Sequence, residues 1–356
     1  MRRGRSGYGL IVPHYRKYAA VKSKCINKDR RTRDMNSLKT VGFPINDKEN
    51  EKRRSLLPTD LKRIKHTGMI YIEEGYGEVL GIPDEAYVKS GAQVASRKEI
   101  LDKDIICDAK IGDAAYLAEL REGQIIFGWV HAVQNREITD AIVDNKLTAY
   151  AWEDMFELTR HLFWRNNQMA GEAAVMHAYL CYGRMPYETK VAVLGKGNVA
   201  QGAIKILTKL GADVTIYDIQ DETLFKKDFK QYDVVVNAVL WDTKRKDHII
   251  YERDLPEMKR GSMIVDISCD RRGGIESSVP TTIEEPYFFK GGVMHYAVDH
   301  TPSLFYKTTS ACISVIVSRY IDELITDEPD DILKKALIIE EGAILDQRIK
   351  DFQNRC

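Results

Sequence analysis

The sequence predicts an α/β protein of two domains, with the second domain inserted into the first. The chain has 356 residues, more than a single hydrophobic core usually serves. From residue 39 onward, short runs rich in Val and Ile alternate with helical stretches. At Lys190 a compact apolar strand leads into a glycine-rich turn and a helix, which begins a second unit of the same kind. Such alternation predicts parallel sheets.

The first unit, residues 36–167, is predicted to be a flavodoxin-like or Rossmann-like α/β domain. Its apolar runs are each followed by polar or glycine-containing connections, as expected where parallel strands end. Strands are predicted at 40–45, 69–72, 105–109 and 125–130, and helices at 56–66, 84–90, 114–121 and 135–146.

The second unit, residues 168–298, follows one or two helices predicted over 152–182, with Gly171 as a tolerated break. After Pro302 the pattern is helical again, so we expect residues 299–356 to be helices that return to the first domain. Strands are predicted at 190–194, 214–217, 234–239, 263–267 and 294–298, and the last helices at 308–326 and 332–353.

The charges are unevenly distributed along the chain. Lys+Arg and Asp+Glu both number 53, so the formal net charge is zero. Residues 1–35 hold eleven Lys or Arg and two Asp, so this tail carries +9 and residues 36–356 carry −9. A transit peptide or an RNA-binding arm has such a composition, but Met35 precedes the first strand, and we expect the natural chain to begin there. The acidic body predicts no nucleic-acid partner.

Neither a membrane segment nor a metal site is expected. The longest apolar runs, 261–267 and 311–317, are far shorter than the ~18 residues of a membrane-spanning helix. The six cysteines are widely spaced, without a CxxC pair or a Cys/His cluster, which argues against disulfides and against zinc. These features predict a cytoplasmic protein.

The strongest local motif is a glycine loop at 195–202. Gly195 permits a tight turn, Gly197 lets the backbone approach a phosphate, and small Ala200 allows close helix packing. Asn198 and Val199 open the following helix, whose free N–H groups favour anions. Because a buried strand enters the loop and a periodic helix leaves it, the motif predicts a Rossmann domain that binds NAD or NADP.

The choice between these two cofactors depends on the end of the next strand. Asp218 lies where an acid accepts hydrogen bonds from the adenosine ribose, and its carboxylate repels a 2′-phosphate. Asp218 therefore favours NAD, although Lys226 and Lys227 follow it and would attract a phosphate.

Two titratable residues follow strands of the first unit. Lys110 comes after the strand 105–109, and His131 comes after the strand 125–130. Ligands bind beyond the carboxyl ends of parallel strands, and His and Lys there can transfer protons or polarise a carbonyl. Taken singly, Lys110 also suits a surface charge and His131 a partly buried structural histidine.

The sequence resembles the alanine dehydrogenase, transhydrogenase and saccharopine dehydrogenase superfamily over residues 38–325. The resemblance begins at Gly42-Phe43-Pro44 and includes the glycine loop. Within the superfamily, residues 151–155, the glycine loop and the turn 299–302 are most similar to N(5)-(carboxyethyl)ornithine synthases. Further matching motifs lie at 50–58, 108–110, 127–131, 265–270, 273–274 and 296–302.

This resemblance implies roles for particular residues. Arg53 would clamp a substrate carboxylate, Lys110 would bind or polarise a keto acid, and His131 would be the acid/base. Asp270 would face the cleft near the nicotinamide ribose or the reacting centre. The turn made by Val298, Asp299 and His300 would line the nicotinamide of the cofactor, which the resemblance suggests is NADP.

The implied reaction is the reductive condensation of pyruvate with the side-chain amine of ornithine or lysine. An alanine dehydrogenase or a saccharopine-dehydrogenase-type oxidoreductase is the nearest alternative. A non-catalytic dinucleotide-binding sensor is an alternative of another class, but it would need none of the four residues Arg53, Lys110, His131 and Asp270. The amphipathic terminal helices and the resemblance predict a homo-oligomer.

Overall fold

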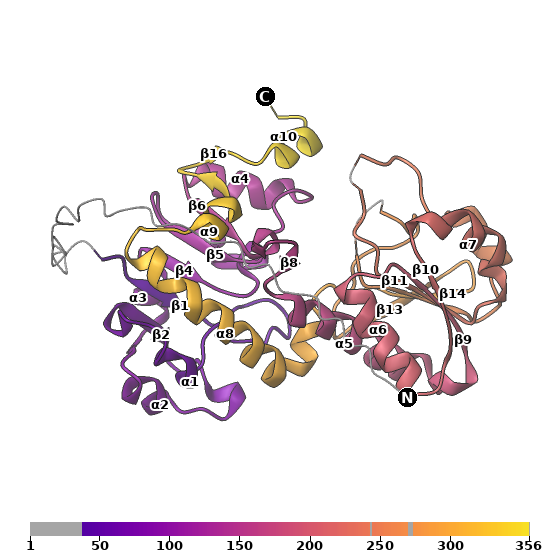
Figure 1. Ribbon diagram of the computed structural model, residues 1–356, viewed down its shortest axis with the longest axis horizontal. Coiled ribbons are helices and arrows are strands. Elements are labelled where there is room, and N and C mark those ends of the chain that lie inside the picture. The colour runs from indigo at the N-terminus through magenta and orange to yellow at the C-terminus, as the bar shows by residue number, and fades with distance from the viewer. Residues whose placement is uncertain (1–37, 243, 270–272, 356) are drawn as a thin grey trace, which may run out of the picture. The chain divides into compact units, whose positions relative to one another are not determined.

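Two large sheets organise the residues that the computed structural model describes, which are 38–242, 244–269 and 273–355. The first sheet has eight strands in the order β16-β15-β6-β5-β4-β1-β2-β3, and its first six strands along the chain pair in parallel (Figure 1). The strands are β1 (Val41–Phe43), β2 (Ile70–Glu73), β3 (Gln93–Ala95), β4 (Ile105–Cys107), β5 (Ile125–Gly128), β6 (Thr148–Ala151), β15 (Leu337–Glu340) and β16 (Ala343–Ile344).

Short helices connect these strands. Two predicted helices are nearly absent: 56–66 holds only the single turn α1, and 114–121 forms the 3-10 helix Ala115–Glu119. Neither segment has a side chain that caps its first turn, so little stabilises a longer helix there. By contrast α4 begins where the Asn135 side chain accepts a hydrogen bond from the Ile138 N–H. The helices are α1 (Pro58–Leu61), α2 (Asp84–Lys89), α3 (Arg97–Leu101) and α4 (Arg136–Asp144).

The second sheet has six strands in the order β10-β9-β11-β12-β14-β13, all parallel except β13. This is the Rossmann-type arrangement that the glycine loop predicted, with β9 leading into α6. Its elements are β9 (Lys190–Leu194), α6 (Asn198–Lys209), β10 (Asp213–Tyr217), α7 (Glu222–Asp228), β11 (Val234–Asn237), β12 (Met263–Asp266), β13 (Tyr287–Lys290) and β14 (Val293–Tyr296).

The long helix α5 (Trp164–Tyr182) packs closely against α6. A Cβ on Gly202 would lie 1.9 Å from the Gln168 carbonyl oxygen, and a Cβ on Gly171 would lie 2.0 Å from that of Val199. Gly171 was expected to be a tolerated break, but α5 is continuous through it. Glycine at this position serves close packing of two helices instead.

Two hairpins were not predicted. Residues 156–161 form β7 (Phe156–Glu157) and β8 (Arg160–His161), where a helix was expected. The prediction of one helix over 332–353 was also wrong, because β15 pairs with β6 and β16 with β15. These strands have two to four residues, too few for a periodic pattern to reveal them. The remaining helices are α8 (Tyr306–Ile325), α9 (Asp331–Ala336) and α10 (Gln347–Gln353).

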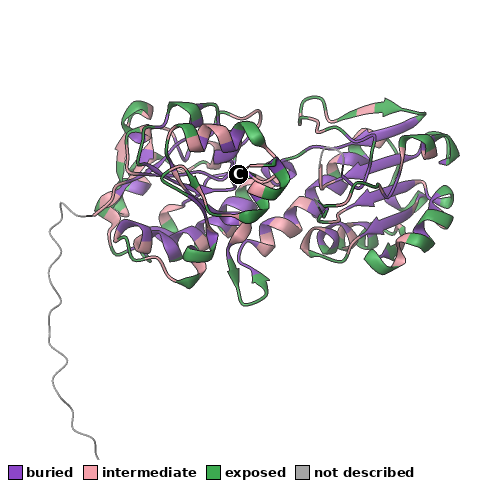
Figure 2. Ribbon diagram, turned by 90° about the horizontal axis from the view of Figure 1, so that it is seen from above, coloured by how far each residue is buried: buried purple, intermediate pink, exposed green. Residues whose placement is uncertain are grey.

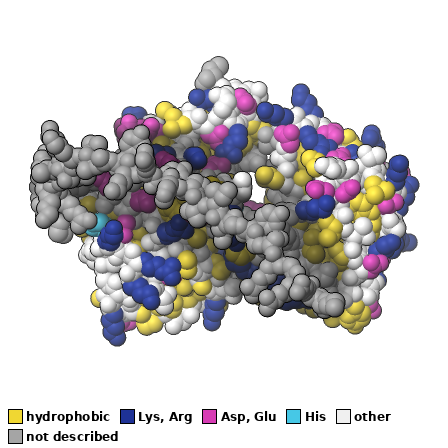
Figure 3. Space-filling model, in the orientation of Figure 1, with side chains coloured by type: hydrophobic (Ala, Val, Ile, Leu, Met, Phe, Trp, Pro, Cys, Tyr) yellow, Lys and Arg dark blue, Asp and Glu magenta, His cyan; other side chains and the backbone are white. Residues whose placement is uncertain are grey.

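Burial follows the layers of the two sheets. The strands are mostly buried and the outer faces of the helices are exposed (Figure 2). On the face seen in Figure 3, basic and acidic side chains are interspersed. None of the helices among the described residues is long and apolar enough to cross a membrane. The basic tail, residues 1–35, lies outside the described residues.

Candidate active site

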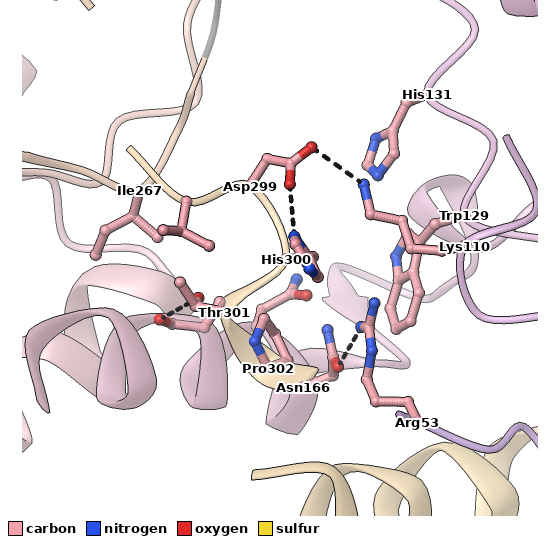
Figure 4. Close-up of a pocket in the computed structure, with 13 residues that line it drawn as sticks. Arg53, Lys110, Trp129, His131, Asn166, Ile267, Asp299, His300, Thr301 and Pro302 are labelled. Carbon is pink, nitrogen blue, oxygen red and sulfur yellow. Dashed lines mark hydrogen bonds and ion pairs between the residues drawn. The ribbon is translucent and has the colours of Figure 1, made fainter. Parts of the chain in front are cut away.

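A pocket collects side chains from segments that follow strands of both sheets and from the start of α5. Arg53, Lys110 and His131 line it together with the turn that follows β14 (Figure 4). Six residues that the sequence singled out therefore share this pocket. The six are Arg53, Lys110, His131, Val298, Asp299 and His300.

Lys110 lies just beyond β4 and is buried, with 5% of its surface exposed. Its ammonium group is 2.5 Å from the carboxylate of Asp113 and 3.9 Å from that of Asp299. The two carboxylates fix the position of the ammonium group at the end of β4. Lys110 is thus equipped to donate a hydrogen bond to a carbonyl or carboxylate oxygen.

His131 lies just beyond β5 and points toward the end of Lys110 (Figure 4). Its φ angle of 54° places a non-glycine residue in the left-handed region, a conformation that persists only where neighbours hold it. The Glu153 carboxylate supplies that support: Oε1 accepts from the His131 N–H at 2.6 Å and Oε2 accepts from the Val130 N–H at 3.2 Å. Burial raises the pKa of Glu153 to about 7.

The electrostatic surroundings of the His131 ring favour its neutral form. Crowding by protein, followed by the positive charge of Lys110, lowers the pKa of His131. The residue is nevertheless exposed to the pocket. His131 is therefore suited to accept a proton at neutral pH.

Arg53 is held by a buried carboxylate. Glu51 accepts from Arg53 Nε at 2.8 Å and from Nη2 at 2.5 Å, and the two side chains are 0% and 3% exposed respectively. Nη1 points the other way and donates to Asn166 Oδ1 at 3.3 Å. The guanidinium group also lies over the Trp129 ring, 5.2 Å from its centroid. A substrate carboxylate can thus meet Arg53 from the Nη1 side.

The turn after β14 places Asp299 next to Lys48 and His300. Lys48 Nζ lies 2.8 Å and His300 Nδ1 also 2.8 Å from its carboxylate oxygens. Although burial opposes ionisation, the hydrogen bond to His300 and the charges of Lys110 and Lys48 hold the pKa of Asp299 well below its usual range. His300 Nε2 bonds to the Glu49 carbonyl oxygen at 2.7 Å. These contacts tie the segment before Arg53 to the turn.

The glycine loop has the geometry that a dinucleotide requires. Gly195 has a φ of 104°, and a Cβ there would lie 2.9 Å from the Ala238 carbonyl oxygen. No atom lies within 4 Å of where a Cβ of Gly197 would stand. Gly197 is the N-cap of α6 and no side chain caps the helix, so the first N–H groups of α6, which include those of Asn198 and Val199, are left for an anion. Ala200 is fully buried, as its packing role predicts.

A second pocket adjoins the end of β10. It is lined mainly by apolar side chains, together with the charged groups of Asp218, Glu222 and Arg245. The Asp218 Oδ1 accepts from the Ile219 N–H at 2.8 Å, and Oδ2 lies 3.3 Å from Lys196 Nζ. An apolar slot beside a carboxylate suits an adenosine. The apolar lining includes Leu194, Ile219, Phe225, Val239 and Ile249.

One predicted site residue lies where the structure describes nothing, and the sequence did not single out several residues that lie at the site. Asp270 lies outside the described residues. Lys48, Glu51 and Lys196 were not singled out, although Lys196 stands between two glycines of the loop and could have been found there. No group of three or more His, Cys, Asp or Glu residues within the described ranges could hold a metal ion.

Comparison with known proteins places the chain in a family. The model for the alanine dehydrogenase/PNT N-terminal domain matches residues 42–165, and that for the C-terminal domain matches 219–347. An N(5)-(carboxyethyl)ornithine synthase of Clostridium botulinum is 33% identical over 79% of this chain and 93% of its own length. One of Lactococcus lactis is 32% identical over 79% and 95%. The chain belongs to the N(5)-(carboxyethyl)ornithine synthase family.

More distant likenesses agree with this family. An alanine dehydrogenase of Mycobacterium tuberculosis is 28% identical over 87% of this chain and 95% of its own. The solved structure of an L-alanine dehydrogenase superposes with a TM-score of 0.74 at 24% identity, covering 88% of this chain and 99% of that one, which establishes the two-domain Rossmann-type fold. The model for the 2-hydroxyacid dehydrogenase NAD-binding domain matches residues 153–276. The chain is an oxidoreductase of this superfamily with a nicotinamide dinucleotide as cofactor.

Proposed function

We propose that the chain condenses pyruvate with the side-chain amine of ornithine and reduces the resulting imine to N(5)-(1-carboxyethyl)ornithine. One observation carries the proposal: Arg53, Lys110 and His131 line a single pocket. The names of the family relatives that are 32–33% identical support it. Cations and a neutral imidazole are the groups that an anionic keto acid and an incoming amine need.

The keto acid is bound by the two cations. Arg53 Nη1 and the Asn166 amide meet its carboxylate, and the Lys110 ammonium group donates to its carbonyl oxygen. The ammonium group of Lys110, held 2.5 Å from Asp113 and 3.9 Å from Asp299, polarises the carbonyl and makes the carbon a better electrophile.

His131 handles the protons. The amine must lose a proton to attack, and the neutral imidazole accepts it. When the carbinolamine forms, the imidazolium returns the proton to the departing hydroxyl, which leaves as water. The Glu153 carboxylate holds the His131 backbone in its left-handed conformation and so keeps the ring directed toward the end of Lys110.

The nicotinamide cofactor, when bound, supplies the hydride that reduces the imine. The turn after β14 forms one wall of the pocket through Val298, Asp299 and His300. We propose that these three residues line the nicotinamide. Asp270 is proposed to act near the same centre. We propose that residues 36–167 and 299–356 together bind the substrates, and that residues 168–298 bind the cofactor.

The working form of the enzyme is proposed to be a homo-oligomer in the cytoplasm. Several large apolar side chains are exposed: Leu158 at 96%, Leu180 at 82% and Phe156 at 41%. Leu158 is at the tip of the hairpin β7–β8, whose two short strands belong to neither large sheet. Light scattering of the purified chain tests this proposal, and a monomeric mass would reject it.

The substrate assignment is tested by following pyruvate-dependent oxidation of NADH and NADPH with different amines. We expect turnover with ornithine, weaker turnover with lysine and none with ammonia. Turnover with ammonia alone would reject the synthase activity in favour of an alanine dehydrogenase. Tight binding of the cofactor without turnover of any amine would favour the sensor.

A further inference from the structure

The lysine between the first two glycines of the loop reaches the carboxylate at the end of the next strand. Lys196 Nζ lies 3.3 Å from Asp218 Oδ2. Among the residues that the structure describes, Lys196 is the one cation within ion-pair distance of Asp218. The side chains are 57% and 40% exposed, so both face the solvent in front of the glycine loop.

The two partners differ in how firmly they are held. Asp218 Oδ1 accepts from the Ile219 N–H at 2.8 Å, and the Asp218 N–H donates to Asp221 Oδ2 at 3.0 Å. The Lys196 ammonium group stands at the end of a flexible four-carbon chain, and the carboxylate of its partner Asp218 is partly exposed to water. A ligand that carries its own anion can thus draw the ammonium group away from the fixed carboxylate at little cost.

The other cations near this pocket are engaged elsewhere. Arg245 donates to Glu222 at 2.8 and 3.0 Å and to Asp247 at 2.7 and 2.9 Å. Lys226, which the sequence suggested as a phosphate partner, donates to Glu222 at 2.7 Å. These acids leave Lys196 as the cation best placed to meet a new negative charge beside Asp218.

We propose that Lys196 is the contact for the 2′-phosphate of an adenosine dinucleotide, and that it lets this chain use NADPH despite Asp218. In the pocket at the end of β10, the 2′ position of the ribose meets the Asp218 carboxylate, which alone would repel a phosphate. The ammonium group of Lys196 lies close enough to bridge the phosphate and the carboxylate. With NADH, the same lysine remains paired with Asp218.

This proposal rests on the proposed function only in taking a nicotinamide dinucleotide as the ligand, so its test uses no turnover. Adenosine 2′,5′-bisphosphate and adenosine 5′-monophosphate differ only in the 2′-phosphate. Both are titrated calorimetrically into the full chain and into Lys196→Met. Lys196→Met removes one charge-assisted hydrogen bond at an exposed site. We therefore expect the affinity for the bisphosphate to fall about tenfold, and the affinity for the monophosphate to fall less than about twofold.

Two further variants sharpen the experiment. Lys226→Met removes a neighbouring cation that pairs with Glu222, and neither ligand should be affected. Asp218→Asn removes the repulsion, so the bisphosphate should bind more tightly while Lys196 is retained. If Lys196→Met weakened the binding of both ligands equally, the lysine would contact the 5′-phosphate. If it weakened the binding of neither, the lysine would not contact the nucleotide. Either result overturns the proposal. Failure of the ornithine assay would leave these titrations unchanged.

Discussion

Gly128 lies so close to Asp108 that a Cβ on the glycine would stand 1.9 Å from the Asp108 carbonyl oxygen. A second contact of this kind joins the same two backbone segments: a Cβ on Gly112 would stand 2.0 Å from the Val130 carbonyl oxygen. The two backbone segments that carry Lys110 and His131 therefore interlock at two glycines. The separation between the proposed carbonyl-polarising group and the proposed base is set by this backbone contact.

The first prediction is that Gly128→Ala damages both stability and catalysis. The added methyl group must push the two segments apart, which costs about 1–3 kcal/mol of unfolding free energy. Because the same displacement separates Lys110 from His131, kcat should fall further than KM changes. Urea unfolding and steady-state kinetics on the same preparation measure the two effects.

Gly68→Ala is the matched control. No atom lies within 4 Å of a Cβ built on Gly68, and its φ is not in the left-handed region. Stability and kcat should remain close to those of the unmodified chain. If both alanine variants lost the same stability and the same activity, the interlocking role of Gly128 would be wrong.

The sequence was sufficient to bring the proposed functional groups to one pocket because they stand at strand ends. Lys110 follows β4, His131 follows β5, and the glycine loop follows β9, all of which are strongly apolar runs. What the sequence could not provide are contacts between segments distant along the chain. The Glu153 support of His131 spans 22 residues, and β15 completes its sheet by pairing with β6, almost 190 residues earlier. No local pattern encodes such pairings.

The second prediction concerns pH and Glu153. Burial raises the pKa of this carboxyl from 4.5 to about 7, so the folded chain holds a proton that the unfolded chain releases. The stability contributed by that proton is fully present below pH ~4.5 and is lost as the pH rises through about 7. Activity should change in the opposite direction, because the ionised carboxylate is the better acceptor for the Val130 and His131 N–H groups. We expect kcat to rise across pH 7.

Glu153→Gln distinguishes this origin from titration of His131. An amide offers one acceptor oxygen where two N–H groups need acceptors, so one hydrogen bond is lost and kcat should drop about tenfold. The rise near pH 7 should vanish from the pH profile of the variant, measured from pH 5.5 to 9. A profile that keeps its rise would assign the titration to another group.

The third prediction is that His131→Asn lowers kcat by about 10²- to 10⁴-fold with ornithine and pyruvate, the contribution expected of a general base. His66→Asn is the control, since His66 bonds to Asp322 at 2.9 Å and does not line the pocket. Calorimetric titration of the cofactor should give the same affinity for both variants. Turnover by His131→Asn within a few-fold of the unmodified chain would rule out the proton-transfer role.

The fourth prediction concerns the buried pair of Glu51 and Arg53. Although burial opposes ionisation, the charge and hydrogen bonds of Arg53 lower the pKa of Glu51. Its contribution to stability is therefore present above the ordinary pKa and is lost as the pH falls below it. Glu51→Gln leaves the guanidinium group buried without a counter-charge and should cost about 3–5 kcal/mol of unfolding free energy.

The double variant Glu51→Gln with Arg53→Met tests whether the two charges act as a pair. Removing both leaves no isolated charge in the core, so the double variant should be more stable than Glu51→Gln alone. The double variant should still lose pyruvate affinity, because the cation that meets the substrate carboxylate is gone, whereas cofactor affinity should be preserved. Strictly additive losses of stability would mean that Glu51 and Arg53 contribute independently. In that case Glu51 would not be what orients Arg53 Nη1 toward the pocket. The hydrogen bond from Nη1 to Asn166 would then be the contact that orients it.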